Sequence, residues 1–270
     1  DSISIANYLN EKNSFTSCYT PQHFNFNDDA EVARKYAKET NLNHTEIEIT
    51  PENYFEHLDE TIDALEQPVF NKSTPSYFYI NKILREAGTI VTYSGDGGDS
   101  LSLSVLDSPR KVFGPDHLNN CMFVEMLTRV SEDFLTRNDK FGSYFGMEGR
   151  FPLLSQSFYK YIMDIPSAVK MENLDPDNFQ NGEYKFLARD GLKDILPDYV
   201  INKQKTGWSI PDNQWRKTQE KFRAKMVERI REPLGNGIDD LVDWQRADGV
   251  KTFYASAFFK TWAKKINLTL

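Results

Sequence analysis

The chain has 270 residues, a formal net charge of −8 and a hydrophobic fraction of 39%. This acidic balance argues against nucleic acid or an anionic membrane as a partner, although backbone amides and Mg²⁺ can still bind a polyphosphate. No apolar run approaches the roughly 20 residues that cross a bilayer. The two cysteines, Cys18 and Cys121, lack metal-ligand spacing. We therefore expect a cytoplasmic protein without a zinc site or a disulfide framework.

The first fifty residues alternate between strand and helix patterns. Residues 14–20 are rich in β-branched and aromatic residues and end at a proline, which predicts a strand. The acidic pair before residue 30 can cap a helix over residues 30–41. Residues 44–50 alternate polar and apolar side chains and predict a second strand.

The next fifty residues continue this order. Thr50, Pro51 and the acids that follow are typical of a helix start. A further helix is predicted over 75–87 and ends at Gly88. The apolar run 89–93 is typical of a buried central strand. Strands that alternate with helices favour a doubly wound parallel sheet.

Strand signals stop after residue 100, and the remaining pattern is helical. We predict helices over 116–137, 155–164, 182–195, 212–231 and 250–266. These helices need a surface against which they can bury their apolar side chains. The expected organisation is one domain over 1–270, with an α/β core over 1–110 and a helical subdomain over 111–270.

A glycine-rich acidic segment, Ser94 to Asp99 (SGDGGD), directly follows the apolar run. In an open parallel sheet, ligands bind beyond the carboxyl ends of the strands. Glycines permit close backbone approach, and two acids three residues apart suit a divalent cation with a nucleotide. A plain strand-to-helix turn with an aspartate cap is the alternative, because a short glycine-rich stretch is weak evidence by itself.

This segment resembles the second nucleotide motif of asparagine synthetases, Ser-Gly-(Glu/Asp)-Gly-x-Asp-Glu. The opening residues, Asp1 and Ser2, resemble the last two residues of the family's first motif, Ser-Gly-Gly-x-Asp-Ser, which is a pyrophosphate loop. Further segments in family order resemble its later motifs: 137–140, 146–154, 182–185 and 203–211. The resemblance predicts that the rest of the loop and its strand precede Asp1.

The resemblance implies the fold of pyrophosphate-loop ATPases and an AMP-forming amide ligase. ATP and Mg²⁺ would be its cofactors, and a small-molecule or peptide carboxylate its substrate. The carboxylate attacks the α-phosphate, and ammonia or another amine then attacks the acyl carbon and releases AMP. A glutaminase domain absent from this chain, or a partner, would supply the ammonia. A homodimer is left open.

The resemblance also assigns roles to individual residues. Asp1 and Asp99 would hold Mg²⁺ and should lie close together. Asp96 would face the acyl centre or the incoming amine, and Lys205 would neutralise the leaving pyrophosphate. Four residues would contact the nucleotide: Ser2, Ser94, Gly95 and Gly97. The charged pair Glu148 and Arg150 is expected to be structural.

Several positions depart from the family pattern. The segment 100–104 replaces the acidic and aromatic residues that should follow the second motif, and Gly182-Glu183 replaces Gly-Lys, which leaves Lys185 as the nearby lysine. These changes favour a substrate other than free aspartate, with an apolar mouth near Leu101 and Leu103.

Three alternatives stay open. The protein could be a nucleotide-binding relative that has lost catalysis. It could be a lactam or peptide cyclase, or an amidotransferase, of the same family. It could also be a non-enzymatic interaction module, because fold alone does not decide function. Without the Ser-Gly-Gly of the first motif, we expect residues 1–270 alone to turn over little or no ATP.

Overall fold

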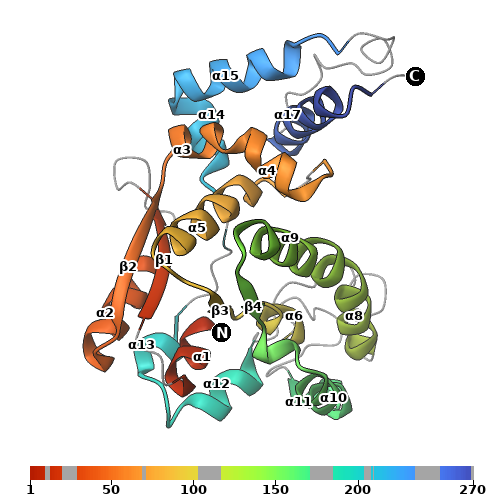
Figure 1. Ribbon diagram of the computed structural model, residues 1–270. Helices are drawn as coiled ribbons and strands as arrows, with labels where there is room; N and C mark the ends of the chain where they lie inside the picture. Colours follow the sequence, from red (N-terminus) through yellow and green to blue (C-terminus); the bar gives the residue numbers. More distant parts are fainter. Residues whose placement is uncertain are drawn as a thin grey trace.

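The computed structural model is a mostly helical α/β structure (Figure 1). It describes residues 1–9, 13–19, 29–68, 71–102, 117–170, 185–203, 208, 210–234 and 250–268. Within these residues, no helix is both long enough and apolar enough to cross a membrane.

The first parallel sheet consists of β1 (Asn13–Tyr19) and β2 (Asn43–Ile49), joined through α2 (Asp29–Thr40). These three elements confirm the sequence prediction. Towards the end of β2, residues alternate between the core and solvent: Ile47 and Ile49 are buried, and Glu48 between them is exposed. A bidentate contact from Arg34 to Glu46, at 2.6 and 2.9 Å, fastens α2 to this strand.

Three helices follow the first sheet: α3 (Pro51–Glu56), α4 (Leu58–Leu65) and α5 (Thr74–Glu86). The predicted start at Thr50 is confirmed by a capping box. The Asn53 N–H donates to Thr50 Oγ1 at 3.2 Å, and the Thr50 N–H donates to Asn53 Oδ1 at 3.0 Å. Gly88, with φ of 84°, follows α5 and permits the left-handed turn that ends it.

The second parallel sheet pairs β3 (Val91–Tyr93) with β4 (Glu148–Arg150). The prediction that residues 89–93 form a buried central strand is wrong, because Ile90 is 63% exposed and Tyr93 is 47% exposed. Among the described residues, β3 pairs along one edge only. The described strands therefore form two separate two-stranded parallel sheets, and the doubly wound sheet is not confirmed.

β4 lies in a segment for which only helices were predicted. Its two charged residues, Glu148 and Arg150, are half exposed and form an ion pair of 3.0 Å, as expected of a structural pair. A three-residue polar strand carries no alternating pattern, so only its pairing with β3 identifies it.

Helices form the rest of the described chain. They start with α1 and α6 in the first part: Ser2–Tyr8 and Gly98–Leu101. Three contiguous helical segments follow, α8, the π-helical η2 and α9: Leu118–Glu125, Met126–Leu135 and Thr136–Phe145. Next come η3, α10, α11, α12 and α13: Pro152–Leu154, Gln156–Asp164, Ser167–Lys170, Phe186–Leu192 and Asp198–Ile201. The last are α14, α15 and α17: Asp212–Thr218, Glu220–Arg231 and Val250–Lys265.

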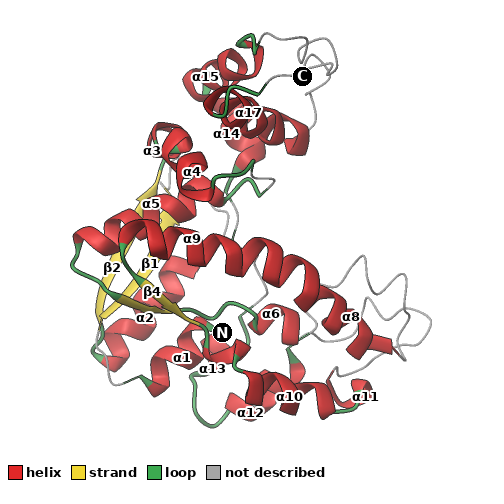
Figure 2. Ribbon diagram, turned by 45° about the vertical axis from the view of Figure 1, so that its right-hand side comes forward, coloured by secondary structure: helices red, strands yellow, loops and turns green. Residues whose placement is uncertain are grey.

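The C-terminal helices bury against the helices that follow the first sheet. Figures 1 and 2 show α14, α15 and α17 beside α3 and α4, away from β3 and β4. An aromatic cluster fills this contact, in which Tyr54 meets Trp215, Phe222 and Tyr254 edge to face. The C-terminal helices thereby complete the core of the chain's first part, while residues of α6, α8, η2, η3 and α10 form a smaller cluster.

Lys170, at the end of α11, is a buried cation. Its side chain is 2% exposed, and its Nζ contacts Asn119 Oδ1 at 2.5 Å and Met122 Sδ at 3.5 Å. No carboxylate pairs with it among the residues that the structure describes. Burial lowers the pKa of the Lys170 ammonium to about 8, because the charged form loses its hydration.

We expect Lys170→Met to raise the free energy of unfolding at pH 7, since it removes a desolvated charge. In the wild type, the folded protein binds fewer protons than the unfolded chain between about pH 8 and 10.5, so its stability rises with pH across that window. The advantage of the variant should therefore shrink from pH 8 to 10.5. Urea unfolding at several pH values measures this, and a constant difference would contradict it.

Candidate nucleotide and metal site

The segment Ser94 to Asp99 forms a tight turn at the carboxyl end of β3. The Gly98 N–H donates to Gly95 O at 3.1 Å, and α6 then starts. Gly97 has φ of 89°, and a Cβ there would lie 2.1 Å from Leu154 Cδ2. Only glycine fits this position, because of both its backbone conformation and its close neighbour.

The opening residues pack directly on this turn. A Cβ on Gly95 would lie 2.6 Å from the Ser2 nitrogen, and a Cβ on Gly98 would lie 2.6 Å from Asp1 Cγ. The two glycines therefore let Asp1 and Ser2 lie against the turn. The structure thus brings together both segments that resemble nucleotide motifs.

Asp1 and Asp99 share one cation, the ammonium of Lys185. Lys185 Nζ lies 2.5 Å from Asp1 Oδ2 and 2.8 Å from Asp99 Oδ1. Lys185 precedes α12, and its backbone N–H donates to Ser102 O at 3.3 Å. Sequence reasoning did not place Lys185 in the site. Its only signal was its position beside the altered Gly182-Glu183 motif.

This pair of carboxylates fits a divalent cation, because it already encloses a positive charge. Mg²⁺ commonly takes one or two protein carboxylates and completes its shell with phosphate oxygens and water. The described residues hold no group of three or more His, Cys, Asp or Glu side chains that could bind a metal by themselves. Asp1 and Asp99 would thus need a nucleotide to complete the site.

Asp96 faces α9. Its Oδ2 accepts from Ser94 Oγ at 2.9 Å and from Asn138 Nδ2 at 3.0 Å. Its backbone N–H donates to Ser94 Oγ at 3.2 Å. Two side chains therefore fix the orientation of the carboxylate at the centre of the turn.

Tyr77, on α5, sets the orientation of Asn138. The Asn138 amide nitrogen also donates to Phe134 O at 2.8 Å, so its oxygen must face the Tyr77 hydroxyl, which donates to it. Burial, and then the nearby Asp96 carboxylate, raise the pKa of Tyr77. The hydroxyl therefore stays protonated and remains a donor. A chain of hydrogen bonds runs from Tyr77 through Asn138 to Asp96.

Replacing Tyr77 with phenylalanine removes the donor that orients Asn138. We expect pyrophosphate release from ATP, the activity that the family resemblance implies, to fall by about fivefold, in line with the roughly 1 kcal/mol of one hydrogen bond, while ATP affinity stays unchanged. Single-turnover pyrophosphate release and equilibrium ATP binding measure the two effects. Tyr79→Phe on the same helix is the matched control. Equal losses of rate and affinity, or no loss of rate, would contradict the role of Tyr77.

Lys205 lies outside the described residues, so its predicted role stays a prediction. The nearest described residues on either side are Lys203 and Trp208. Lys203 forms an ion pair with Asp29 at 2.8 Å. The Trp208 ring meets Tyr77 edge to face with centroids 5.7 Å apart. Trp208 therefore lies against the same tyrosine that orients Asn138.

Two of the altered residues after the turn, Ser100 and Leu101, are buried in the protein. Ser100 is 1% exposed and its Oγ donates to Glu125 Oε1 at 3.4 Å, while Leu101 is 5% exposed and packs against Cys121 and Met122. The expectation that Leu101 lines an apolar mouth is wrong, because the short helix α6 turns it into the core. Leu103 lies outside the described residues.

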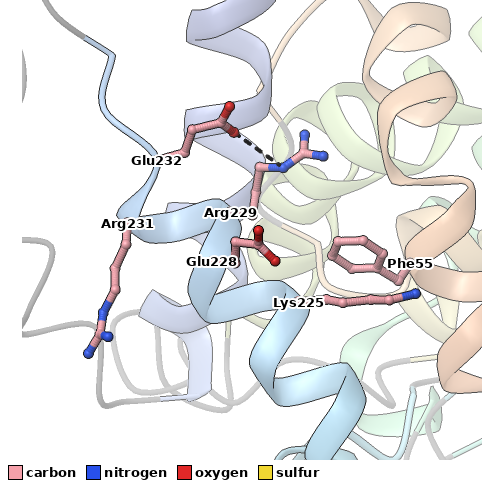
Figure 3. Close-up of a pocket in the computed structure, with 6 residues that line it drawn as sticks. All are labelled: Phe55, Lys225, Glu228, Arg229, Arg231 and Glu232. Atoms are coloured by element: carbon pink, nitrogen blue, oxygen red, sulfur yellow. Dashed lines mark ion pairs between the residues drawn. The ribbon is translucent and has the colours of Figure 1, made fainter.

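A hollow of about 650 Å³ lies elsewhere, between α3 and α15 (Figure 3). Some of its lining cations already have partners. Arg229 pairs with Asp59 at 2.5 Å and with Glu232 at 3.9 Å, and Lys225 lies over the Phe55 ring at 5.3 Å. Figure 3 shows Arg231 pointing away from the other lining residues. This hollow shares no residue with the turn, so we do not assign it to the site.

These observations define a class of protein: an α/β structure whose acidic, glycine-rich turn lies at the carboxyl end of a parallel strand. Comparison with known families is more specific. The family described as asparagine synthase matches residues 1–104 and 102–265. Since these matches cover most of the chain, the protein belongs to the asparagine synthase family.

Individual relatives are more distant. Asparagine synthetase [glutamine-hydrolyzing] 1 of Bacillus subtilis (strain 168) is 28% identical over 102 residues, or 38% of this chain and 15% of the relative. Asparagine synthetase [glutamine-hydrolyzing] 2 of Oryza sativa subsp. japonica is 25% identical over 187 residues, which are 67% of this chain and 31% of the relative. Asparagine synthetase [glutamine-hydrolyzing] 3 of Arabidopsis thaliana is 24% identical over 187 residues, again 67% of this chain and 31% of the relative. The chain thus spans less than a third of the length of these relatives.

Proposed function

We propose that this chain is the synthetase part of an ATP-dependent, AMP-forming amide ligase. The carboxylate oxygen of the substrate attacks the α-phosphorus of ATP, and the bond to pyrophosphate breaks. The nitrogen of ammonia or another amine then attacks the acyl carbon. AMP leaves with the carboxylate oxygen, and the amine loses a proton.

One observation carries this proposal: in a member of the asparagine synthase family, Asp1 and Asp99 lie together around a cation at the turn that resembles the nucleotide motif. Negative charge would grow on the leaving pyrophosphate, and a metal held by Asp1 and Asp99 would supply a positive charge that stabilises it. The nucleotide would contact this turn through Ser94, Gly95 and Gly97, and through Ser2, which packs on it. We assign the fixed carboxylate of Asp96 to the acyl centre or the incoming amine.

The supply of the amine is also part of the proposal. The three relatives carry glutamine-hydrolyzing in their names, so we propose that ammonia comes from a glutaminase domain or partner of this chain. The proposed setting is the cytoplasm, where ATP and glutamine are available.

A catalytically impaired relative is the second candidate, because the residues after Asp99 differ from the family pattern. The burial of Ser100 and Leu101 limits this argument, since both residues contact helix α8. A loss of catalysis would instead have to arise at the turn or at Lys205.

Pyrophosphate release from ATP tests the proposal. The full-length protein is mixed with ATP, Mg²⁺, ammonium and a panel of carboxylates that contains aspartate, peptides and sugar acids. We expect release that depends on one carboxylate class. ATP binding without release for every carboxylate would favour the impaired relative. Neither binding nor release would favour an interaction module, and robust asparagine formation would remove our preference for another substrate.

A further inference from the structure

Lys185 occupies the place where a metal shared by Asp1 and Asp99 would lie. Its Nζ is 2.5 Å from one carboxylate and 2.8 Å from the other, so one ammonium contacts both. A metal bound to the same two oxygens would lie at about 2.0–2.1 Å from each. The ammonium and the metal would overlap in space and would repel each other, so their occupancy is mutually exclusive.

The backbone holds Lys185 at this place in a conformation that lysine rarely adopts. Its φ is 60°, in the left-handed region, and its N–H donates to Ser102 O. Ser102 directly follows α6, the helix that contains Asp99. The segment from Asp99 to Ser102 thus holds Lys185 at two points. Ser102 O binds the lysine's backbone N–H, and the Asp99 carboxylate binds its ammonium. The side chain is 18% exposed, so its flexible stem has a route to solvent.

We propose that Lys185 is a tethered counter-cation that competes with the divalent metal for Asp1 and Asp99. In the nucleotide-free protein, its ammonium keeps two otherwise repelling carboxylates together. Metal binding displaces it. Free Mg²⁺ therefore binds weakly, and the site accepts metal chiefly when the nucleotide brings further oxygen ligands. This inference rests on the proposed metal site and adds its control by a residue of this chain.

The test measures Mn²⁺ binding to the nucleotide-free, full-length protein by electron paramagnetic resonance, which counts free Mn²⁺. Lys185→Met should bind Mn²⁺ about tenfold more tightly than the wild type, because it removes a competing and repelling charge. Lys185→Arg keeps a cation at the position and should bind Mn²⁺ as weakly as the wild type. Lys193→Met is the matched control. Lys193 directly follows α12, and its exposed ammonium pairs with Asp190 on that helix.

The same titration separates this inference from the proposed function. Asp99→Asn should weaken Mn²⁺ binding. If it does and Lys185→Met does not tighten binding, the competition is wrong and the metal site stands. If Asp99→Asn has no effect, both are overturned. If Mn²⁺ binds neither the wild type nor Lys185→Met measurably, the competition alone is wrong, because the site would then need the nucleotide whether or not the lysine is present. Equal tightening by Lys185→Met and Lys193→Met would also overturn the competition, because general charge would then explain it.

A second readout follows the lysine itself. The rate at which an amine-acetylating reagent modifies Lys185, measured by mass spectrometry, should rise when Mn²⁺ is added and stay constant for Lys193. A Lys185 rate that does not respond to saturating Mn²⁺ would contradict displacement.

Discussion

Asp99→Asn is expected to lower carboxylate-dependent pyrophosphate release by about 100-fold or more, which is typical for the loss of one group that stabilises transition-state charge. The substitution replaces the carboxylate that we propose as a metal ligand with a neutral amide of nearly the same shape. Its neighbours make it sensitive, because Asp99 shares its counter-cation with Asp1 across the closely packed Gly98. Single-turnover release at saturating ATP and carboxylate measures the effect.

Asp190→Asn is the control for this prediction. Asp190 is an exposed carboxylate on α12 that pairs with Lys193, so its removal changes the net charge equally and leaves the turn intact. We expect its rate to equal that of the wild type. A rate for Asp99→Asn within threefold of the control, at unchanged folding, would contradict the metal role assigned to Asp99.

Trp215→Ala should cause the largest loss of stability, about 3–5 kcal/mol in the free energy of unfolding. Trp215 is 1% exposed and meets Tyr54 and Phe222 edge to face, each with centroids 5.6 Å apart. The substitution leaves a cavity between the C-terminal helices and α3, and it also removes favourable aromatic contacts. Urea unfolding followed by circular dichroism measures the change.

Trp208→Ala provides the comparison, because Trp208 is 37% exposed and its ring meets Tyr77 alone among the described aromatic residues. Its cost should be no more than about half that of Trp215→Ala, since more than a third of its surface is already exposed to solvent. Similar losses for the two variants would show that the aromatic cluster does not hold the C-terminal helices in place.

The sequence predicted the early elements well because their signals are local. Alternation in β2, the cap at Thr50 and the glycine after α5 each act within a few residues. The prediction for residues 89–93 was wrong because the burial of a strand depends on distant residues. Their apolar pattern indicates a strand but not which neighbours cover it, and Ile90 and Tyr93 are exposed here. β4 likewise depends on a distant partner strand.

The site was predictable only where a motif is contiguous. The turn from Ser94 to Asp99 and its partner Asp1 were identified through the family resemblance, and the structure brings them together. Lys185 reaches Asp1 from 184 positions away, and Tyr77 reaches Asn138 across 61. No spacing in one sequence encodes such contacts, because they arise when helices from different parts of the chain pack around the turn.

Transfer of oxygen from the substrate into AMP tests the central claim most directly. The full-length protein is supplied with ATP, Mg²⁺, an amine and the accepted carboxylate labelled with ¹⁸O, and the nucleotide products are analysed by mass spectrometry. Adenylation predicts AMP and pyrophosphate as products, with one labelled oxygen in each AMP, because the acyl–oxygen bond breaks when the amine attacks. ADP with the label in inorganic phosphate, or unlabelled AMP, would contradict an acyl-adenylate and with it the function proposed for this chain.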